Sequence, residues 1–342
     1  MNLSPINPCK IIAEIGLSHE GSLGFAFSAI EAAAKSGADI VKFQVHSAFH
    51  ESSSEEKFRV AFSKQDQTRA DYWERTAFST KQWAQLVEHC NQLRVEFSAS
   101  VFNSYSLNQM IDLGVHTIKL GSGDLLNQEF QEVLQEFSGF LILSTGMATW
   151  AEMQSAIDSY SRFKKEERLA VLQCTSRYPT DLSLVGINVM EEISRKFNIP
   201  SGLSDHTSNL SSSVIAISKG ARFIEKHVVF SREMFGPDVS SSIDFSELKR
   251  LTDFRDDFLL ISNQVDKDEL ARELQETRVL FGRSLGLKGD FAEGHVLRIE
   301  DFCLRKPHGG LSWDERLEFV GKKLSRPYSH QNLFERSHVV LD

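Results

Sequence analysis

The 342-residue chain has few cysteines, and none of them forms a Cys-x-x-Cys pair or a closely spaced group. The four thiols lie far apart in the sequence, at Cys9, Cys90, Cys174 and Cys303. This spacing argues against a small fold that depends on disulfide bonds. We therefore expect a protein of a reducing compartment.

Two further features are missing, one of charge and one of hydropathy. No run rich in lysine or arginine occurs, and the net charge is -9 with an isoelectric point near 5.7, which argues against a nucleic-acid-binding or anionic-membrane surface. The start of the chain lacks a basic segment followed by an apolar run, and no apolar stretch approaches the length of a membrane span. We expect a cytoplasmic protein without nucleic-acid or membrane partners. An anionic small substrate is still compatible with this charge if a few lysines gather at one place.

What the sequence does contain is an alternation of short apolar segments with amphipathic helical segments. Eight segments are predicted as buried strands: 11–16, 39–44, 95–100, 117–121, 140–145, 169–174, 201–205 and 223–228. Helices are predicted between them, including 128–137, and the last one covers 245–262; Ser79 and Thr149 begin capping-box patterns. Eight strand-helix units are typical of an α/β fold of the (β/α)8 TIM-barrel type. A doubly wound open sheet is the alternative, but no Gly-x-Gly-x-x-Gly follows the first strand.

Two segments depart from this repeat. Residues 46–79 are polar, charged and aromatic without a clear period, and they are longer than an ordinary connection, which indicates a functional lid or excursion. A barrel domain is thus predicted at 1–262, followed by a charged linker at 263–280 with a helix over 266–277. Residues 281–342 contain many glycines between short apolar runs, which predicts a small β-rich domain. Because so small a domain is marginally stable alone, we expect it to dock on a partner surface.

Two histidines stand at the ends of neighbouring predicted strands. His206 follows 201–205, and His227 lies near the end of 223–228, with a helical segment between them. If these strands are parallel neighbours, their carboxyl ends lie side by side and the two imidazoles converge. Imidazole binds first-row divalent metals, and two imidazoles leave coordination positions open for substrate oxygens. The spacing alone matches no metal motif, so two unrelated histidines, one in the core and one at the surface, are the alternative.

Other polar side chains are predicted at the same edge of the barrel. Lys42 and Lys119 stand on separate strands, and because an uncompensated ammonium is costly to bury, they indicate a bound anion. Gly121-Ser-Gly123 and Ser144-Thr-Gly146 offer hydroxyl and backbone N–H groups for phosphate oxygens, although each tripeptide alone is more typical of an ordinary turn. Together with the histidines, these groups predict a phosphate beside a divalent metal. The other polar residues at the predicted strand ends are Glu14, Glu20, Gln44, Ser98, Ser100, Asp124, Thr145, Gln173, Thr175, Ser176, Ser204, Asp205, Glu225 and Lys226.

These motifs resemble those of the N-acetylneuraminate (sialic acid) synthase family, which condenses phosphoenolpyruvate with an N-acylated amino-sugar aldehyde to make nonulosonic acids. The matching runs cover nearly the whole predicted barrel in order: Ala13-Glu-Ile-Gly-x-x-His-Glu-Gly21, Gly37-Ala-Asp-x-Val-Lys-Phe-Gln44, Ile118-Lys-x-Gly-Ser-Gly123, Ile142-Leu-Ser-Thr-Gly-Met147, Cys174-Thr-x-x-Tyr-Pro179, Gly202-Leu-Ser-Asp-His-Thr207, Glu225-Lys-His227 and Gly236-Pro-Asp238. In the tail, Gly282-Arg-Ser-Leu285 and Lys288-Gly-Asp-Phe-Ala-Glu-Gly294 are similar to the family's C-terminal antifreeze-like (SAF) domain.

The resemblance implies a role for each matched polar residue. It makes His206 and His227 the ligands of a divalent metal, with Mn2+ the family's usual ion and Mg2+ or Co2+ as alternatives. The residues implied to contact phosphoenolpyruvate are Lys42, Lys119, Ser122, Ser144 and Ser204. Of these, Lys42 and Lys119 are also expected to act in catalysis. Those implied to contact the amino sugar are Glu20, Gln44, Tyr178 and Asp238. Glu20 is also placed to transfer a proton, unless its carboxylate only faces the start of the helix near Ser22.

The resemblance also implies a quaternary structure. In the family, the SAF domain of one subunit reaches over the barrel of the other in a domain-swapped homodimer. Such an arrangement agrees with the marginal stability expected of residues 281–342 alone.

Four positions depart from the family pattern: Ser18, Asp124, Ser176 and Lys306. The family carries Asn, Glu and Asn at the first three, and it has Arg-Pro in the tail where this chain has Lys306-Pro307. Asp124 is still expected to act in catalysis, and Ser176 and Lys306 in substrate binding. Because altered polar contacts change discrimination between substrates, the sugar is left open among N-acetylmannosamine, a 6-deoxy diacetamido sugar and a phosphorylated form.

Two alternatives to this function follow from the same residues. Ser18, Asp124 and Lys306 also fit a catalytically degraded homologue that binds a sugar or a partner protein. A synthase of eight- or seven-carbon sugar acids would share the barrel chemistry but lack the C-terminal module, so the tail from Phe281 argues against it.

Overall fold

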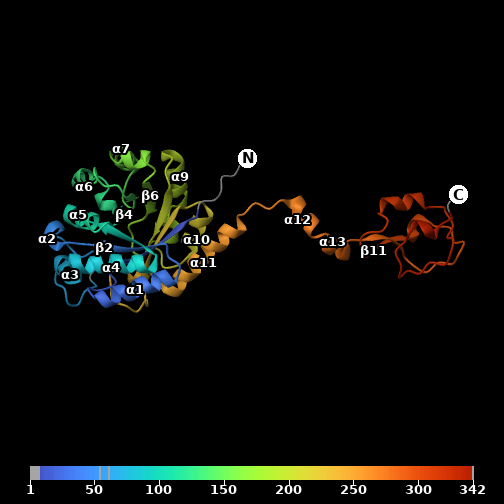
Figure 1. Ribbon diagram of the computed structural model, residues 1–342, viewed down its shortest axis with the longest axis horizontal. Coiled ribbons are helices and arrows are strands. Elements are labelled where there is room, and N and C mark those ends of the chain that lie inside the picture. The colour runs from blue at the N-terminus through green and yellow to red at the C-terminus, as the bar shows by residue number, and fades with distance from the viewer. Residues whose placement is uncertain (1–7, 54, 61, 341–342) are drawn as a thin grey trace. The chain divides into compact units, whose positions relative to one another are not determined.

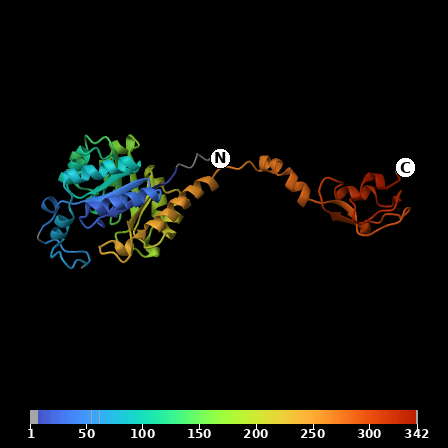
Figure 2. The ribbon, with the colours of Figure 1, turned by 60° about the horizontal axis from the view of Figure 1, so that its bottom comes forward.

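The computed structural model describes residues 8–53, 55–60 and 62–340. The chain divides into two compact units, Met1–Ser262 and Asn263–Asp342. In Figures 1 and 2 the second unit is the part coloured from orange to red after helix α11. Each unit has a hydrophobic core of its own.

A closed sheet of eight parallel strands forms the centre of the first unit, because each strand pairs with the next and β1 pairs with β8. The strands are β1 (Lys10–Gly16), β2 (Ile40–Val45), β3 (Glu96–Val101), β4 (Thr117–Leu120), β5 (Phe140–Ser144), β6 (Leu169–Cys174), β7 (Ser201–Asp205) and β8 (Phe223–Val229). A short strand, β9 (Ile243–Asp244), pairs with the end of β8. The predicted (β/α)8 barrel is therefore confirmed.

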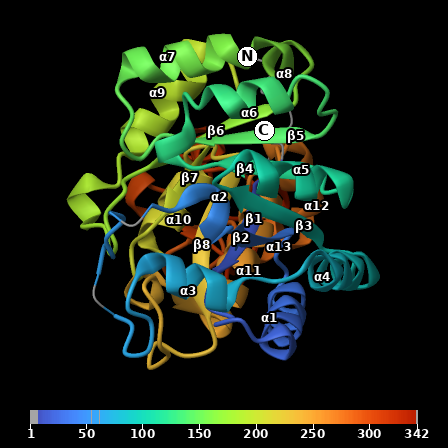
Figure 3. The same ribbon diagram turned by 90° about the vertical axis from the view of Figure 1, so that its left-hand side faces the viewer.

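Helices follow the strands and cover the outside of the sheet, as Figure 3 shows for α1, α4 and α7. They are α1 (Leu23–Lys35), α4 (Thr80–Leu93), α5 (Ser104–Asp112), α6 (Gln128–Val133), α7 (Trp150–Ser159), α8 (Ser161–Lys165), α9 (Ile187–Phe197), α10 (Ser211–Ser218) and α11 (Phe245–Ile261). The capping boxes predicted at Ser79 and Thr149 are present. Helix α6 ends before the predicted position at residue 137. The chain turns there toward β5, and Gly139 packs so closely on His116 that a Cβ atom would lie 2.1 Å from its carbonyl oxygen.

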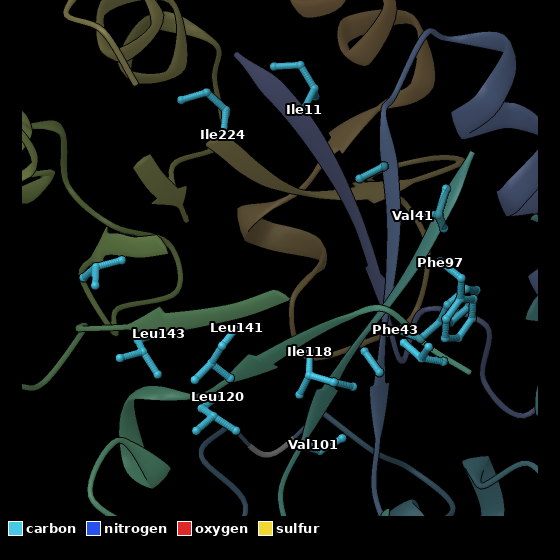
Figure 4. Close-up of a cluster of buried hydrophobic side chains, with 14 of the residues drawn as sticks. Ile11, Val41, Phe43, Phe97, Val101, Ile118, Leu120, Leu141, Leu143 and Ile224 are labelled. Carbon is cyan, nitrogen blue, oxygen red and sulfur yellow. The ribbon is translucent and has the colours of Figure 1, made fainter. Parts of the chain in front are cut away.

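Side chains alternate between the two faces of each barrel strand. Those on the outer face pack against the helices, and Figure 4 shows Ile11, Val41 and Leu141 among them. Those on the inner face begin with an apolar layer that includes Ile12 and Ile142. Toward the carboxyl ends the inner positions become polar, and this change places a set of charged side chains at the mouth of a packed barrel.

The excursion at 46–79 contains two short helices, α2 (Ala48–Glu51) and α3 (Arg69–Thr76). Helix α3 begins at a capping box formed by Thr68 and Asp71. Leu17, Tyr72 and Trp73 form a small buried cluster with partly buried residues of the excursion. The absence of a periodic pattern agrees with residues 52–53, 55–60 and 62–68, the described part between the two helices, which form no helix or strand.

The second unit begins with two helices, α12 (Lys267–Glu273) and α13 (Gln275–Phe281), where the sequence predicted one. Its antiparallel pair, β10 (Ser284–Leu287) and β11 (Phe302–Arg305), packs in a small core. The buried residues of that core are Leu285, Leu287, Leu297, Phe302, Phe319, Leu324, Tyr328, Phe334 and Val339. None of the helices in the described part of the chain combines the length and apolar character needed to cross a membrane.

Candidate active site

Two imidazoles meet at the carboxyl ends of β7 and β8. These strands are parallel neighbours, and Ser204 pairs with Glu225 in their register. His206 directly follows β7 and His227 lies in β8, so the centroids of their rings are 5.5 Å apart. Both side chains are buried. The two histidines therefore share one site at the mouth of the barrel.

His206 is held as a neutral imidazole. Burial, together with His227 and Lys119 nearby, lowers its pKa to about 3. Its Nδ1 atom lies 3.0 Å from the carbonyl oxygen of Thr175. Because a carbonyl oxygen can only accept, Nδ1 carries the hydrogen and Nε2 keeps its lone pair. The ring of Tyr178 stacks on this imidazole, with the centroids 4.0 Å apart.

This pair of histidines fits a metal site with two protein ligands. A neutral imidazole nitrogen is a suitable donor for first-row divalent metal ions. Within residues 8–53, 55–60 and 62–340, no group of three or more His, Cys, Asp and Glu side chains is arranged to hold a metal ion. A metal bound at His206 and His227 would thus keep positions open for substrate oxygens or water.

A layer of buried charges lies in the barrel at the same strand ends. The Nζ atom of Lys42 is 2.6 Å from the Glu14 carboxylate and 3.6 Å from that of Glu225. Lys119 donates to Glu225 and, at 3.3 Å, to the hydroxyl of Ser204. Ser204 in turn donates to Glu225 at 2.9 Å. Two ammonium groups and two carboxylates therefore form one connected network.

Glu225 and Lys119 favour each other's charged form in the barrel. Burial alone would raise the pKa of Glu225, but Lys119 and Lys42 lower it overall. Burial alone would lower the pKa of Lys119, but Glu225 raises it overall. The premise that the buried lysines lack a counter-charge is therefore wrong, because Glu14 and Glu225 supply it. Sequence reasoning placed both glutamates at strand ends but gave them no role. The alternation of side chains along a strand puts Glu225 on the same face as His227, and this pattern could have indicated that Glu225 belongs to the site.

Asp205 and Lys226 were predicted at the barrel mouth, and here the structure gives a correction. They alternate with the inward-facing residues, so their side chains lie on the outer face of the barrel. Both are fully buried there, and Lys226 Nζ lies 3.1 Å from Asp205 Oδ2. Asp205 also accepts the backbone N–H of Thr207 at 2.8 Å and the hydroxyl of Ser212 at 2.6 Å. This network fixes the chain immediately after β7 and thereby positions His206.

Three serines at the ends of different strands meet near Gly146: Ser122 follows β4, Ser144 ends β5, and Ser176 follows β6. The Gly146 N–H donates to Ser122 Oγ at 2.7 Å, and Ser122 donates to Ser144 Oγ at 3.4 Å. A Cβ atom on Gly146 would lie 2.2 Å from Ser176 Oγ, so only glycine allows this approach. The structure thus brings together the three hydroxyl groups that the sequence predicted as phosphate or substrate contacts.

Glu20 and Gln44 lie on the opposite side of the mouth. The Glu20 carboxylate accepts from the Tyr72 hydroxyl at 2.9 Å and from Arg75 at 2.9 Å. These partners belong to the excursion, and Ser22 alone caps helix α1 with its side chain. Gln44 donates to Glu14 at 3.1 Å and so joins the charged layer. Tyr72 and Arg75 were not identified from the sequence, since no motif marks residues 46–79.

Tyr178 and Asp238 are joined by a residue that the sequence did not single out. The guanidinium carbon of Arg59 lies 4.1 Å from the centroid of the Tyr178 ring. Arg59 also donates to the Asp238 carboxylate at 2.7 Å. All three residues line one cleft of about 180 Å³ at the barrel mouth.

Asp124 and Lys306, two of the departures from the family pattern, lie in different units of the chain. Asp124 belongs to the turn Ser122–Asp124 after β4; it accepts from Asn127 at 3.2 Å, and burial raises its pKa. Lys306 lies in the second unit, where its Nζ atom stands 5.0 Å from the centroid of the Phe281 ring. Its expected contact with a substrate stays a prediction.

The third departure, Ser18, lies beside the histidine site. It lines a small cavity together with His227, Gly236 and Asp238. Its backbone N–H donates to the carbonyl oxygen of Ile15 at 3.0 Å, which holds the turn after β1. A change of residue at position 18 therefore alters the surroundings of a proposed metal ligand.

Comparison with known proteins gives consistent matches. Residues 29–261 match the sequence profile of the NeuB family. The chain is 31% identical over 337 residues to the N,N'-diacetyllegionaminic acid synthase of Legionella pneumophila, covering 97% of this chain and 94% of that protein. It is 28% identical over 347 residues to the N-acetylneuraminate-9-phosphate synthase of Drosophila melanogaster, covering 94% and 93%. The crystal structure of N-acetylneuraminic acid (sialic acid) synthetase from Leptospira borgpetersenii in complex with citrate matches with a TM-score of 0.68 and 27% identity, covering 81% of this chain and 95% of that one.

Proposed function

Because this chain belongs to the NeuB family of sialic-acid-type synthases, we propose that it condenses phosphoenolpyruvate with an N-acylated amino-sugar aldehyde to form a nonulosonic acid and phosphate. The observation that carries the proposal is the position of His206 and His227. Their ring centroids are 5.5 Å apart, and they lie next to the buried layer of lysines and glutamates. Such a site can hold a polarised aldehyde beside an anionic second substrate.

Phosphoenolpyruvate is assigned to the charged layer and the three serines. Lys42 and Lys119 offset the charge of its carboxylate and phosphate, while Ser122, Ser144 and Ser176 offer hydroxyl groups to the phosphate oxygens. Because each lysine already has a carboxylate partner, binding a second anion requires the lysines to share their hydrogen bonds. This need favours a ligand that arrives together with a divalent cation.

A divalent metal, Mn2+ by resemblance, would be held by His206 and His227 and would polarise the aldehyde oxygen of the sugar when bound. Around it, Tyr178 and Asp238 would orient the sugar so that its aldehyde carbon faces C3 of phosphoenolpyruvate. A C–C bond then forms between these carbons, and the aldehyde oxygen becomes a hydroxyl group by taking a proton. Water adds at C2 and phosphate leaves, which gives the 2-keto acid.

Glu20 is proposed to manage a proton in these steps. Its carboxylate is held by Tyr72 and Arg75, so it can accept a proton from water or a sugar hydroxyl without losing its position. Helix α1 is capped by the Ser22 side chain, so it does not need Glu20 for its cap. Asp124, whose pKa is raised by burial, is a second candidate for this task.

The C-terminal unit is proposed to be an SAF-like module that docks on a second copy of this chain. Within the described residues of that unit, nine form the buried core, which is small, and the family arrangement is a swapped homodimer. Sedimentation equilibrium at micromolar concentration should give a dimer. A monomer at every concentration tested would contradict this part of the proposal.

The experiment that tests the function is phosphate release from phosphoenolpyruvate in the presence of Mn2+, across a panel of N-acetylmannosamine, 6-deoxy diacetamido sugars and their phosphorylated forms. Release should occur with at least one sugar and be abolished by His206→Ala. Absence of release with every sugar, in folded protein shown to bind Mn2+, would favour the degraded, sugar-binding homologue instead.

A further inference from the structure

Arg59 lies on the excursion at 46–79 and touches both residues that the proposed function uses to orient the sugar. Its guanidinium covers the ring of Tyr178 at 4.1 Å, and its Nη2 atom donates to Asp238 Oδ1 at 2.7 Å and to the carbonyl oxygen of Pro237 at 3.4 Å. Tyr178 stacks in turn on His206. Arg59 is therefore separated from a proposed metal ligand by a single aromatic ring.

The cleft in front of this group has both apolar and polar walls. Its apolar lining comes from Leu17, Phe58, Phe62, Tyr72, Trp73 and Phe102, and Gln44, His46 and Arg69 also line it. The aromatic part of the lining favours methyl groups over hydroxyl groups, because burying apolar surface is favourable whereas an unpaired hydroxyl is costly to desolvate. An acyl methyl group, or a carbon without its oxygen, suits this lining.

The Asp238 carboxylate is paired with Arg59. Among the described residues, Arg59 is the only side chain that forms an ion pair with it. The hydrogen bond engages Oδ1, and within the same residues Oδ2 makes no hydrogen bond to the protein. Oδ2 can therefore accept a hydrogen bond from an amide N–H or a hydroxyl group of a bound sugar.

We propose that Arg59 is a specificity-determining residue of the acceptor subsite: it holds Asp238 and Tyr178 in place to receive an amino sugar whose acyl substituent packs in the aromatic cleft. The inference rests on the proposed function, since it takes the sugar as the occupant of this cleft. It adds that Arg59 and the acyl substituent of the sugar determine which sugar is accepted. The planar guanidinium is suited to this double role, because it can stack on a ring and pair with a carboxylate at once.

The test compares Arg59→Ala with Lys64→Ala, which removes an exposed positive charge from the same excursion. Steady-state rates would be measured with the active acylated sugar and with its unacylated amine. Arg59→Ala should raise the KM for the acylated sugar by about tenfold or more, reduce the preference for it over the amine, and leave the KM for phosphoenolpyruvate within about twofold. Arg59→Lys should restore only part of the loss, and Lys64→Ala should behave as the wild type.

A double-mutant cycle with Asp238→Asn separates this role from a general structural one. If Arg59 acts through Asp238, its removal should cost less in the Asp238→Asn background. Equal losses in both backgrounds, or a rise in the KM for phosphoenolpyruvate as large as that for the sugar, would overturn the proposal.

Calorimetric titration of each variant with the acylated sugar alone tests the role of Arg59 separately from the proposed synthase activity. Binding that depends on Arg59 without turnover would contradict the synthase and support the subsite. Turnover that is the same in Arg59→Ala and Lys64→Ala would support the synthase and overturn the role of Arg59.

Discussion

The Nζ atom of Lys42 lies 2.6 Å from the Glu14 carboxylate inside the barrel, and both side chains are almost completely buried. The two residues are register partners on β1 and β2, so their contact follows from the order of the strands. The same ammonium group donates to Ser100 at 2.6 Å. Lys42, which is proposed to bind phosphoenolpyruvate, therefore also stabilises the barrel in the absence of ligand.

Replacing Lys42 by methionine should reduce both stability and substrate binding. The change leaves the buried Glu14 carboxylate without its cation, which costs about 3–5 kcal/mol, and it removes one positive charge from the proposed phosphoenolpyruvate site. Urea unfolding and the KM for phosphoenolpyruvate measure the two effects. In Glu14→Gln/Lys42→Met the stability should largely return while the KM stays high. Recovery of both would mean that Lys42 has no role beyond neutralising Glu14.

Gly146→Ala should damage the serine cluster. The new Cβ atom would lie 2.2 Å from Ser176 Oγ and 2.9 Å from Ser122 Oγ, so the hydroxyl groups must move. We expect a KM for phosphoenolpyruvate raised by about tenfold and a stability loss of about 1–3 kcal/mol. Gly24→Ala, in helix α1, is the matched control, because its Cβ atom meets nothing within 4 Å. Wild-type kinetics in Gly146→Ala would remove this cluster from the substrate site.

The barrel could be predicted from the sequence because its physical signals are local. Apolar segments such as Leu169–Cys174 end where glycine or polar residues begin, and the helices carry capping boxes. Once the strand order is known, the convergence of His206 and His227 follows from parallel neighbours sharing an edge. The fold and the centre of the site were thus accessible without coordinates.

The parts that could not be predicted depend on contacts between distant segments. The pairing of Lys42 with Glu14 needs the register of two strands, and the outward direction of Lys226 needs the phase of the alternation at the strand end. Arg59 lies in an excursion without a period, so its place over Tyr178 depends on tertiary packing alone. Sequence reasoning gave Lys42 and Glu14 a location but no partner, placed Lys226 wrongly at the barrel mouth, and did not single out Arg59.

The ion pair between Asp66 and Arg75 should make stability depend on pH in the acid range. Two hydrogen bonds from Arg75, both 2.8 Å, are the main cause that lowers the pKa of Asp66 below its ordinary value of 3.8. Because the folded pKa lies below the unfolded one, the stabilisation is fully present above the unfolded value and is lost as the pH falls through the folded value. The difference in melting temperature between wild type and Asp66→Asn should therefore shrink from pH 6 toward the acid limit of folding. A constant difference would contradict this linkage.

The four cysteines should differ in reactivity. Burial raises the pKa of Cys9 and of Cys90 to about 12, and it raises that of Cys174 as well, whereas Cys303 is partly exposed. Since the thiolate is the reactive form, iodoacetamide at pH 8 should label Cys303 first in the native protein. Peptide mass spectrometry reads out the sites, and the unfolded protein should label at all four. Labelling of Cys90 before Cys303 in the native state would show that the core around α4 opens.

The most direct test of the central claim is the fate of C3 of phosphoenolpyruvate. Phosphoenolpyruvate labelled with 13C at C3 would be incubated with the protein, Mn2+ and the sugar panel. The label should appear in a product whose mass equals that of the sugar plus pyruvic acid. NMR should show the labelled methylene bonded to the former aldehyde carbon. Labelled pyruvate beside unchanged sugar, or labelled phosphoenolpyruvate that persists with every sugar, would contradict a C–C bond-forming synthase.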